Sequence, residues 1–149
     1  MKKEFNHDIC SKIQLLPMLE SPRLNIYLID DDLEDQEIFE MALEETGINA
    51  NLCCFSNVST GIEQLTSLEK KPEFLFLDLN MPKINGLECL KMLSELSFKN
   101  SIKVIIYSTS SNINDINKTK ALGAHDYLIK PVNFNGLVES LTNILSVAD

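Results

Sequence analysis

The sequence predicts an α/β fold with a doubly wound, five-stranded parallel sheet and helices on both faces. Strand-like and helix-like segments alternate from Leu24 to the C-terminus, which is typical of parallel sheets joined by crossover helices. The segments around Phe74 and Val104 are apolar without a polar residue at every second position, as strands buried on both faces require. The common strand order for this pattern is 2-1-3-4-5, in which strands 1 and 3 are neighbours.

The strands and the first two helices have clear signals. The strands are expected at 24–30, 51–55, 74–78, 103–108 and 126–129. The first helix carries Ile38, Phe39, Ala42 and Leu43 on one face and ends near Gly47, because glycine is a common helix stop signal. The second helix spans about 58–69 and has apolar residues at helical spacing.

The remaining three helices follow the third, fourth and fifth strands. The third helix begins after Asn85 and Gly86. The fourth begins after Asn112, a good N-cap residue, and ends near Gly123. The last helix has apolar residues at helical spacing: Phe134, Leu137, Leu141, Ile144 and Leu145.

Residues 1–23 fall outside this repeat and are expected to form an N-terminal extension of a single domain over 24–149. Their apolar residues are spaced for one helix face, and two prolines would end that helix: Phe5, Ile9, Ile13 and Leu16, followed by Pro17 and Pro22. Two interpretations stay open. The extension packs on the domain or is partly disordered, or it is a helix that docks a partner.

Charge and cysteine content narrow the function classes. The net charge is −9, from 13 basic and 22 acidic residues, so direct nucleic-acid binding and an anionic membrane surface are disfavoured. The four cysteines match no zinc or redox motif, and Cys53 and Cys54 lie in an apolar segment, so we expect buried side chains. With no signal peptide and no membrane-spanning segment expected, a cytoplasmic location is the simplest interpretation.

Three of the expected strands end in charged residues. Asp30 and Asp31 follow the first strand, Asp78 ends the third, and Lys130 and Pro131 follow the fifth. In open α/β sheets, the carboxyl edge of the strands is where ligands bind. The sequence therefore predicts one acidic pocket that contains one lysine. Asp32, which comes next in the chain, is interpreted as a helix N-cap or a solvated residue.

The predicted pocket favours a divalent cation and a phosphoryl group. Two carboxylates about 4 Å apart repel by about 4 kcal/mol at an effective dielectric of about 20, so a cation or a proton is needed. Hard oxygen ligands suit Mg²⁺, which with Lys130 balances the three carboxylates. An aspartate can then attack phosphorus to form an aspartyl phosphate, and Ser108 could bond a phosphate oxygen.

Taken together, these residues resemble the receiver domains of two-component response regulators, of the chemotaxis type that consists of a receiver alone. The resemblance covers about 24–147, and Lys130 follows Ser108 by 22 residues. It implies a flavodoxin-like fold. The matching segments are Ile29 to Asp31, Asp78 to Gly86, Ser108, and Lys130 with Pro131.

The resemblance also implies a role for each site residue. Asp78 resembles the phosphoacceptor, and the Mg²⁺ ligands would be Asp30, Asp31, Asp78 and the backbone carbonyl of Asn80. Ser108 and Lys130 resemble the phosphoryl-binding residues, with Ser108 and Tyr127 as the switch pair. The remaining assignments are these: Asn80 and Ser110 tune the phosphoryl lifetime, Pro131 follows a cis peptide bond, and Gly86 permits a tight turn.

The expected function is signalling rather than enzymatic turnover. A histidine kinase or phosphotransfer protein would donate the phosphoryl group, and a protein partner would bind the face formed by the fourth helix, fifth strand and fifth helix. Homodimer formation stays open. Two other functions stay open: an interaction module that is not phosphorylated, and a hydrolase of the haloacid dehalogenase type. The hydrolase reading is weak because Asn80 occupies the position of its second aspartate.

Overall fold

The computed structural model describes residues 23–146. Within them, five parallel strands form one sheet in the order β2-β1-β3-β4-β5, which confirms the predicted order. The strands are β1 (Leu24–Ile29), β2 (Ala50–Phe55), β3 (Phe74–Leu77), β4 (Lys103–Ser108) and β5 (Asp126–Ile129). The predictions for residues 1–22 lie outside the described residues.

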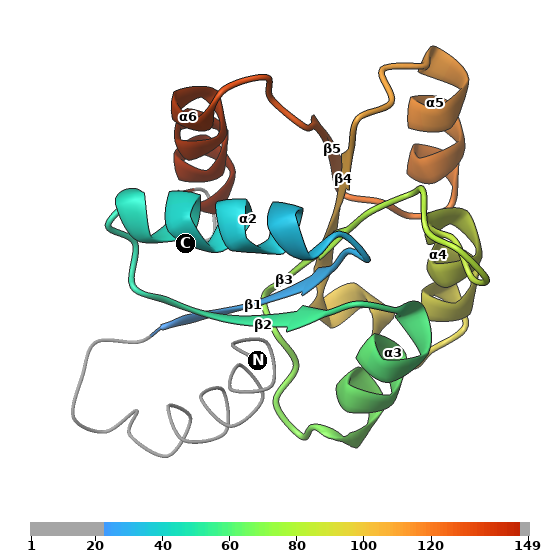
Figure 1. The fold of residues 1–149 in the computed structure, drawn as a ribbon. Helices are drawn as coiled ribbons and strands as arrows, with labels where there is room; N and C mark the ends of the chain where they lie inside the picture. Colours follow the sequence, from blue (N-terminus) through green and yellow to red (C-terminus); the bar gives the residue numbers. More distant parts are fainter. Residues whose placement is uncertain (1–22, 147–149) are drawn as a thin grey trace.

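Within residues 23–146, five α-helices follow the strands and cover both faces of the sheet (Figure 1). They are α2 (Leu33–Glu45), α3 (Val58–Ser67), α4 (Gly86–Ser94), α5 (Ile113–Ala121) and α6 (Phe134–Leu145). Helices α2 and α6 lie on one face, and α3, α4 and α5 lie on the other. A short 3₁₀ helix that the sequence reading missed, Lys99–Ser101, precedes β4.

Two apolar clusters, one on each face, hold the sheet between its helices. Phe39 of α2, Phe76 of β3 and Leu141 of α6 belong to one cluster, and each is 0% exposed. Leu65 of α3 and Cys89 of α4 belong to the other, and both are also 0% exposed. Strands β3 and β4 contribute residues to both clusters and are buried on both faces, as their unbroken apolar sequence predicted.

An Asx residue precedes and caps each of the five α-helices in the described part of the chain. The side chain of Asp32 accepts hydrogen bonds from the backbone N–H groups of Glu34 and Asp35, which confirms the N-cap interpretation of Asp32. Asparagines cap the other four helices: Asn57, Asn85, Asn112 and Asn133. Because each cap follows a strand, these helix starts lie at the carboxyl edge of the sheet.

Two smaller sequence predictions, the helix stop at Gly47 and the burial of Cys53 and Cys54, are also confirmed. Gly47 follows the last turn of α2 with φ +74°, a conformation that favours glycine. Cys53 and Cys54 are buried, at 6% and 4% exposed. Among residues 23–146, no helix is long and apolar enough to cross a bilayer.

Candidate functional site

The carboxyl edge of the central strands gathers three aspartates. Ile29 and Leu77 are register partners in β1 and β3, so Asp30 and Asp78 leave neighbouring strands at the same level. Carboxylate oxygens of Asp30, Asp31 and Asp78 lie within 4.8 Å of one another. Asp30 is 0% exposed and Asp78 is 6% exposed, whereas Asp31 faces solvent. The predicted acidic pocket is therefore present.

Backbone contacts fix the two buried aspartates. The Asp78 N–H donates to the carbonyl of Ile29 at 3.0 Å, which continues the β1–β3 pairing past the last strand residue. Each carboxylate also accepts a local N–H. Asp30 Oδ1 accepts from Asp32 N at 2.9 Å, and Asp78 Oδ1 accepts from Asn80 N at 3.2 Å. These bonds leave the second oxygen of each carboxylate facing the pocket.

Gly86 allows α4 to begin directly against the backbone of the site. A Cβ atom at Gly86 would lie 2.6 Å from the Asp78 carbonyl oxygen and 2.7 Å from Leu79 Cα. The Gly86 N–H donates to the Leu79 carbonyl at 3.0 Å. In the loop between, Lys83 has φ 65°, an uncommon conformation for a residue other than glycine. The absence of a side chain at Gly86 thus lets the start of α4 lie against the backbone of Asp78 and Leu79.

Lys130 brings a positive charge from the end of β5. Its Nζ lies 2.9 Å from Asp30 Oδ2 and 3.7 Å from Asp78 Oδ2. Nζ also lies 2.8 Å from Asp35 Oδ2 and 5.0 Å from the centroid of the Tyr107 ring. Asp35 was not singled out from the sequence. The sequence feature that could have indicated it is its place in the first turn of α2, three residues after the capping Asp32. A side chain at this position can point back toward the end of the preceding strand.

The pocket shifts the pKa values of its charged groups. Burial raises the pKa of Asp30 to about 6, although the Asp32 N–H and Lys130 oppose that shift. Burial also raises the pKa of Asp78 despite the nearby Lys130. For Lys130, burial lowers the pKa, but hydrogen bonds to Asp35 and Asp30 outweigh it, and the pKa is raised. The carboxylates therefore hold their charges at a cost that a further cation would offset.

The donor set fits a hard divalent cation. The three aspartates offer carboxylate oxygens from buried and exposed positions on one rim, and Mg²⁺ usually takes one or two protein carboxylates and keeps several waters. The exposed Asp31 leaves the rim open to solvent. Asn80 follows Asp78 in the adjoining loop, where its carbonyl is the remaining ligand that the sequence interpretation named.

A chain of hydrogen bonds leads from β4 to β5. Ser108 is 0% exposed, and its Oγ accepts from Ser110 N at 3.1 Å. The Ser110 hydroxyl donates to Asp115 at 2.7 Å, and the Tyr127 hydroxyl donates to the Ser110 carbonyl at 2.8 Å. Ser108, Ser110 and Tyr127, which the sequence interpretation singled out separately, are thus linked in the structure.

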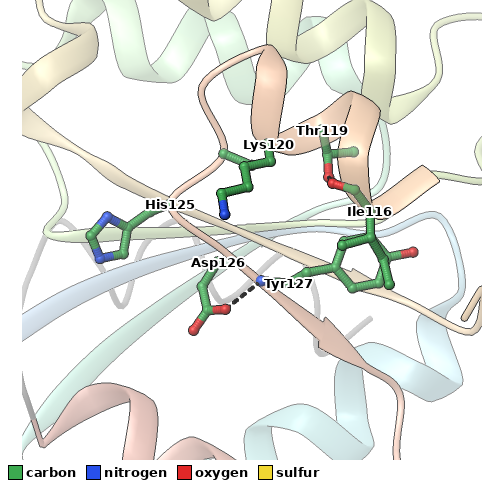
Figure 2. Close-up of a pocket in the computed structure, with 7 residues that line it drawn as sticks. Ile116, Thr119, Lys120, His125, Asp126 and Tyr127 are labelled. Atoms are coloured by element: carbon green, nitrogen blue, oxygen red, sulfur yellow. Dashed lines mark hydrogen bonds between the residues drawn. The ribbon is translucent and has the colours of Figure 1, made fainter. Parts of the chain in front are cut away.

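Tyr127 also lines a pocket of about 180 Å³ between α5 and β5, shown in Figure 2. Ile116, Thr119 and Lys120 of α5 contribute to it from one side, and His125 and Asp126 from the other. The half-buried ring of Tyr127 lies between this pocket and the loop that follows Ser108.

Comparison with known proteins identifies the family. Residues 26–142 match the response regulator receiver domain. This chain belongs to that family. Receiver domains are part of two-component signal transduction, so the family predicted from the motifs is confirmed. Receivers in general are signalling modules rather than enzymes.

Among curated relatives, this receiver is similar to a CpxR homolog of Haemophilus influenzae, a transcriptional regulatory protein, with 31% identity. The match covers 80% of this chain and 49% of the relative. It is also 38% identical to the nitrate/nitrite response regulator NarL of Escherichia coli, over 58% of this chain and 38% of the relative. The chain thus spans about half or less of the length of these relatives.

Solved structures show the same fold. The bacteriophytochrome response regulator RtBRR is 28% identical with a TM-score of 0.70, and the match covers 83% of this chain and 78% of that one. The Mn²⁺-bound response regulator Rcp1 is 25% identical with a TM-score of 0.73, covering 85% and 94% of the two chains. The receiver's flavodoxin-like architecture, expected from its strand order, is confirmed.

One expectation about the receiver is wrong. The Lys130–Pro131 peptide bond is trans, not cis. Trans is favoured by about 0.5–1 kcal/mol for bonds that precede proline, so the local chemistry gives no reason for the cis form. The Lys130 N–H still donates to the Ser108 carbonyl at 2.7 Å, so the backbone of Lys130 is held at the end of β4, and its side chain reaches the acidic pocket.

Proposed function

We propose that this receiver accepts a phosphoryl group on Asp78 from a phosphohistidine on a histidine kinase or phosphotransfer protein. The observation that best supports this proposal is the pair of contacts made by the two carboxylate oxygens of Asp78. One of its carboxylate oxygens is tied to a backbone N–H, and the other lies 3.7 Å from a lysine ammonium. A buried carboxylate with one oxygen that accepts no backbone N–H and lies beside a cation is arranged to attack phosphorus.

In the proposed step, an Asp78 oxygen forms a bond to phosphorus while the phosphorus–nitrogen bond of the phosphohistidine breaks. The leaving imidazole nitrogen keeps the electron pair of that bond. Lys130 lies where it can donate to an equatorial phosphoryl oxygen, and the buried Ser108 hydroxyl lies at the end of β4, on the same edge. Such positioned donors supply most of the catalysis in phosphoryl transfer.

We further propose that the reaction depends on Mg²⁺. Asp30, Asp31, Asp78 and the Asn80 carbonyl would hold the ion, which would supply positive charge to the phosphoryl oxygens. The chain's own residues support this assignment, because three carboxylates within 4.8 Å of one another have one lysine among them. Asp30 and Asp31 thus act by holding charge near Asp78 rather than by bonding to phosphorus.

The signal would leave through the α5–β5–α6 face, by contact with another protein. A phosphoryl group that draws in the Ser108 hydroxyl would break its bond with Ser110 N, and Ser110 carries the carbonyl to which Tyr127 donates. Phosphorylation would thereby shift the population between two positions of Tyr127. Asn80 and Ser110, at the pocket rim, would tune the phosphoryl lifetime. We place this module, with its extension over 1–23, in the cytoplasm.

Phosphoryl transfer is tested with phosphoramidate, a small donor that needs no kinase. With Mg²⁺, the protein should gain the mass of one phosphoryl group, and chelation of the metal should abolish the gain. The adduct should be absent in Asp78→Asn and Asp78→Ala but present in Asp126→Asn, which removes an exposed carboxylate at the other end of β5. Labelling that persists in both Asp78 variants would refute the assignment.

The metal site has a separate test in thermal unfolding. An ion that binds only the folded protein stabilises it, by about 2.7 kcal/mol at 100 times its Kd. Mg²⁺ should therefore raise the melting temperature of the wild type and raise it less in Asp31→Asn. A protein that binds Mg²⁺ but never takes up phosphate from phosphoramidate or a phosphohistidine protein would favour the phosphorylation-independent interaction module.

A further inference from the structure

The ammonium of Lys130 is held unevenly by three carboxylates. Nζ lies 2.8 Å from Asp35 Oδ2 and 2.9 Å from Asp30 Oδ2, both within hydrogen-bond range. The third distance, to Asp78 Oδ2, is 3.7 Å, beyond that range. The two short contacts therefore hold the ammonium back from the carboxylate that our proposed function makes the phosphoacceptor.

Asp35 is in a fixed position to provide this hold. Its backbone N–H is bound by the capping side chain of Asp32 at 3.2 Å, so it sits in the first turn of α2. The side chain of Asp35 is 32% exposed, whereas Asp30 is fully buried, and that of Lys130 is 11% exposed. Asp35 thus reaches Lys130 from the solvent side of the pocket, and Asp30 from within.

Lys130 is also fixed along its length. Its backbone N–H is bound to the Ser108 carbonyl at 2.7 Å, and its ammonium lies 5.0 Å from the centroid of the Tyr107 ring. Asp35, Tyr107 and Lys130 line one pocket of about 220 Å³ beside the start of α6. The backbone bond, the ring and the two carboxylates hold the ammonium beside Asp78, which is the third carboxylate within 4 Å of it.

We propose that Asp35 is a positioning residue that holds Lys130 away from Asp78 and so keeps the phosphoryl-accepting oxygen free. Without Asp35, the ammonium would be shared by Asp30 and Asp78 alone and would close on Asp78 as a direct ion pair. That pair would occupy the electron pair that attacks phosphorus. In the held position, the ammonium makes no hydrogen bond to Asp78 Oδ2 and remains near enough to donate to an oxygen of a phosphoryl group bound there. The inference rests on the proposed function of Asp78.

A simpler role for Asp35 predicts the opposite sign. If Asp35 acted only as one more negative charge near the pocket, it would repel anionic phosphoryl donors, and its removal would speed phosphorylation. If it holds Lys130, its removal slows phosphorylation at saturating donor. The matched control is Glu37→Gln, because Glu37 is an exposed acidic residue of the same helix.

The first experiment measures phosphoryl uptake from phosphoramidate at saturating Mg²⁺. Asp35→Ala should lower the maximal rate on the order of tenfold, since misplacing a reacting group by about 1 Å can cost up to a hundredfold. The donor concentration at half-maximal rate should change little. Asp35→Glu should recover part of the rate, and Glu37→Gln should match the wild type. A rate in Asp35→Ala equal to or above that of the wild type would overturn the proposal.

A double-mutant cycle tests whether Asp35 acts through Lys130. In a Lys130→Ala background, the further change Asp35→Ala should leave the residual rate of phosphoryl uptake unchanged, because the group being positioned is gone. A rate that falls by the same factor in both backgrounds would mean that Asp35 acts on the fold or on the donor, and would refute the positioning role.

A spectroscopic measurement separates this inference from the proposed function. The ¹⁵N signal of the Lys130 ammonium in the unphosphorylated protein should move in Asp35→Asn, which keeps the shape of the side chain, and stay in place in Glu37→Gln. An unmoved signal in Asp35→Asn refutes the hold on Lys130. If the wild type never takes up a phosphoryl group, the proposed function fails, while this signal still shows whether Asp35 holds the lysine.

Discussion

The two edges of the sheet carry polar groups of different kinds. At the amino edge, Asn51 of β2 donates to the Asn25 side chain of β1 at 3.1 Å, and Glu73 accepts from the Asn25 backbone at 2.6 Å. At the carboxyl edge, three carboxylates crowd within 4.8 Å. The polar groups at the amino edge are paired by hydrogen bonds, and like charges are gathered at the carboxyl edge.

This difference separates polar residues that serve the fold from those that serve a function. A buried polar group with a partner contributes to stability or costs little, whereas a buried charge among like charges costs stability. Asn25 and Asn51 are 9% and 7% exposed, so their pairing explains why they are tolerated. Asp30 and Asp78 each have one backbone N–H and the shared Lys130 as partners, yet burial still raises the pKa of both carboxyl groups. A ligand that needs negative charge would explain why this cost is retained.

The largest expected effect is on the backbone beneath the carboxyl edge. In Gly86→Ala, the new Cβ would lie 2.6 Å from the backbone oxygen of Asp78, and backbone cannot yield as a flexible side chain can. We expect a loss of about 3 kcal/mol, the upper end for overpacking, and a melting temperature lower by about 6–12 °C. Phosphoryl uptake should also fall, since Asp78 moves with its backbone.

The control for Gly86→Ala is Gly136→Ala. At Gly136, the nearest atom to a new Cβ is the side-chain oxygen of Asn133, the N-cap of α6, at 3.1 Å, so that side chain would have to shift by only a few tenths of an ångström and no backbone atom lies closer. We expect a small change in melting temperature and unchanged phosphoryl uptake. If the melting temperature and phosphoryl uptake fall equally in the two variants, the close approach of α4 to the Asp78 backbone does not matter more than any other glycine contact.

The next effect tests the amino edge. Asn25→Ala removes the acceptor of the Asn51 amide and leaves a buried donor without its partner. We expect a loss of about 1–2 kcal/mol in unfolding free energy, measured by urea denaturation. Asn117→Ala on the exposed face of α5 is the control and should change stability little. If Asn25→Ala leaves the unfolding free energy unchanged, the paired amides at the amino edge do not stabilise the fold, and the difference between the two edges is refuted there.

The carboxyl edge should respond with the opposite sign. Burial raises the pKa of Asp78, so its charged form costs stability in the metal-free protein. Asp78→Asn keeps the oxygen that accepts from Asn80 N and removes the charge. We expect a gain in unfolding free energy at neutral pH, smaller than the loss in Asn25→Ala. A loss would show that attraction to Lys130 outweighs burial and repulsion.

Part of the carboxyl edge could be predicted from the sequence, and part of it could not. The strand order and the meeting of Asp30, Asp78 and Lys130 were predictable, because apolar strands in this order bring their charged ends to one edge. Asp35 was not predictable in the same way. Its contact with Lys130 joins residues 95 apart in the chain and depends on the Asp32 cap that orients the first turn of α2. The predicted cis bond at Pro131 followed the family resemblance alone, and the structure has it trans.

The smallest expected effect is a dependence of stability on pH that only the carboxyl edge should show. The pKa of Asp30 is about 6 in the folded protein against an ordinary 3.8, so the folded state binds this proton more tightly than the unfolded state does. Its contribution to stability is therefore complete below about pH 4 and is lost as the pH rises toward about 6.

Thermal unfolding without divalent cations should show that loss as a difference between the wild type and Asp30→Asn, and the loss should persist in Asp126→Asn. The effect of Asn25→Ala should be the same at every pH, because paired amides do not titrate. A difference curve for Asp30→Asn that stays flat between pH 4 and 6 would mean that Lys130 and the Asp32 N–H already balance the burial of Asp30, and that this edge, like the amino edge, is paired.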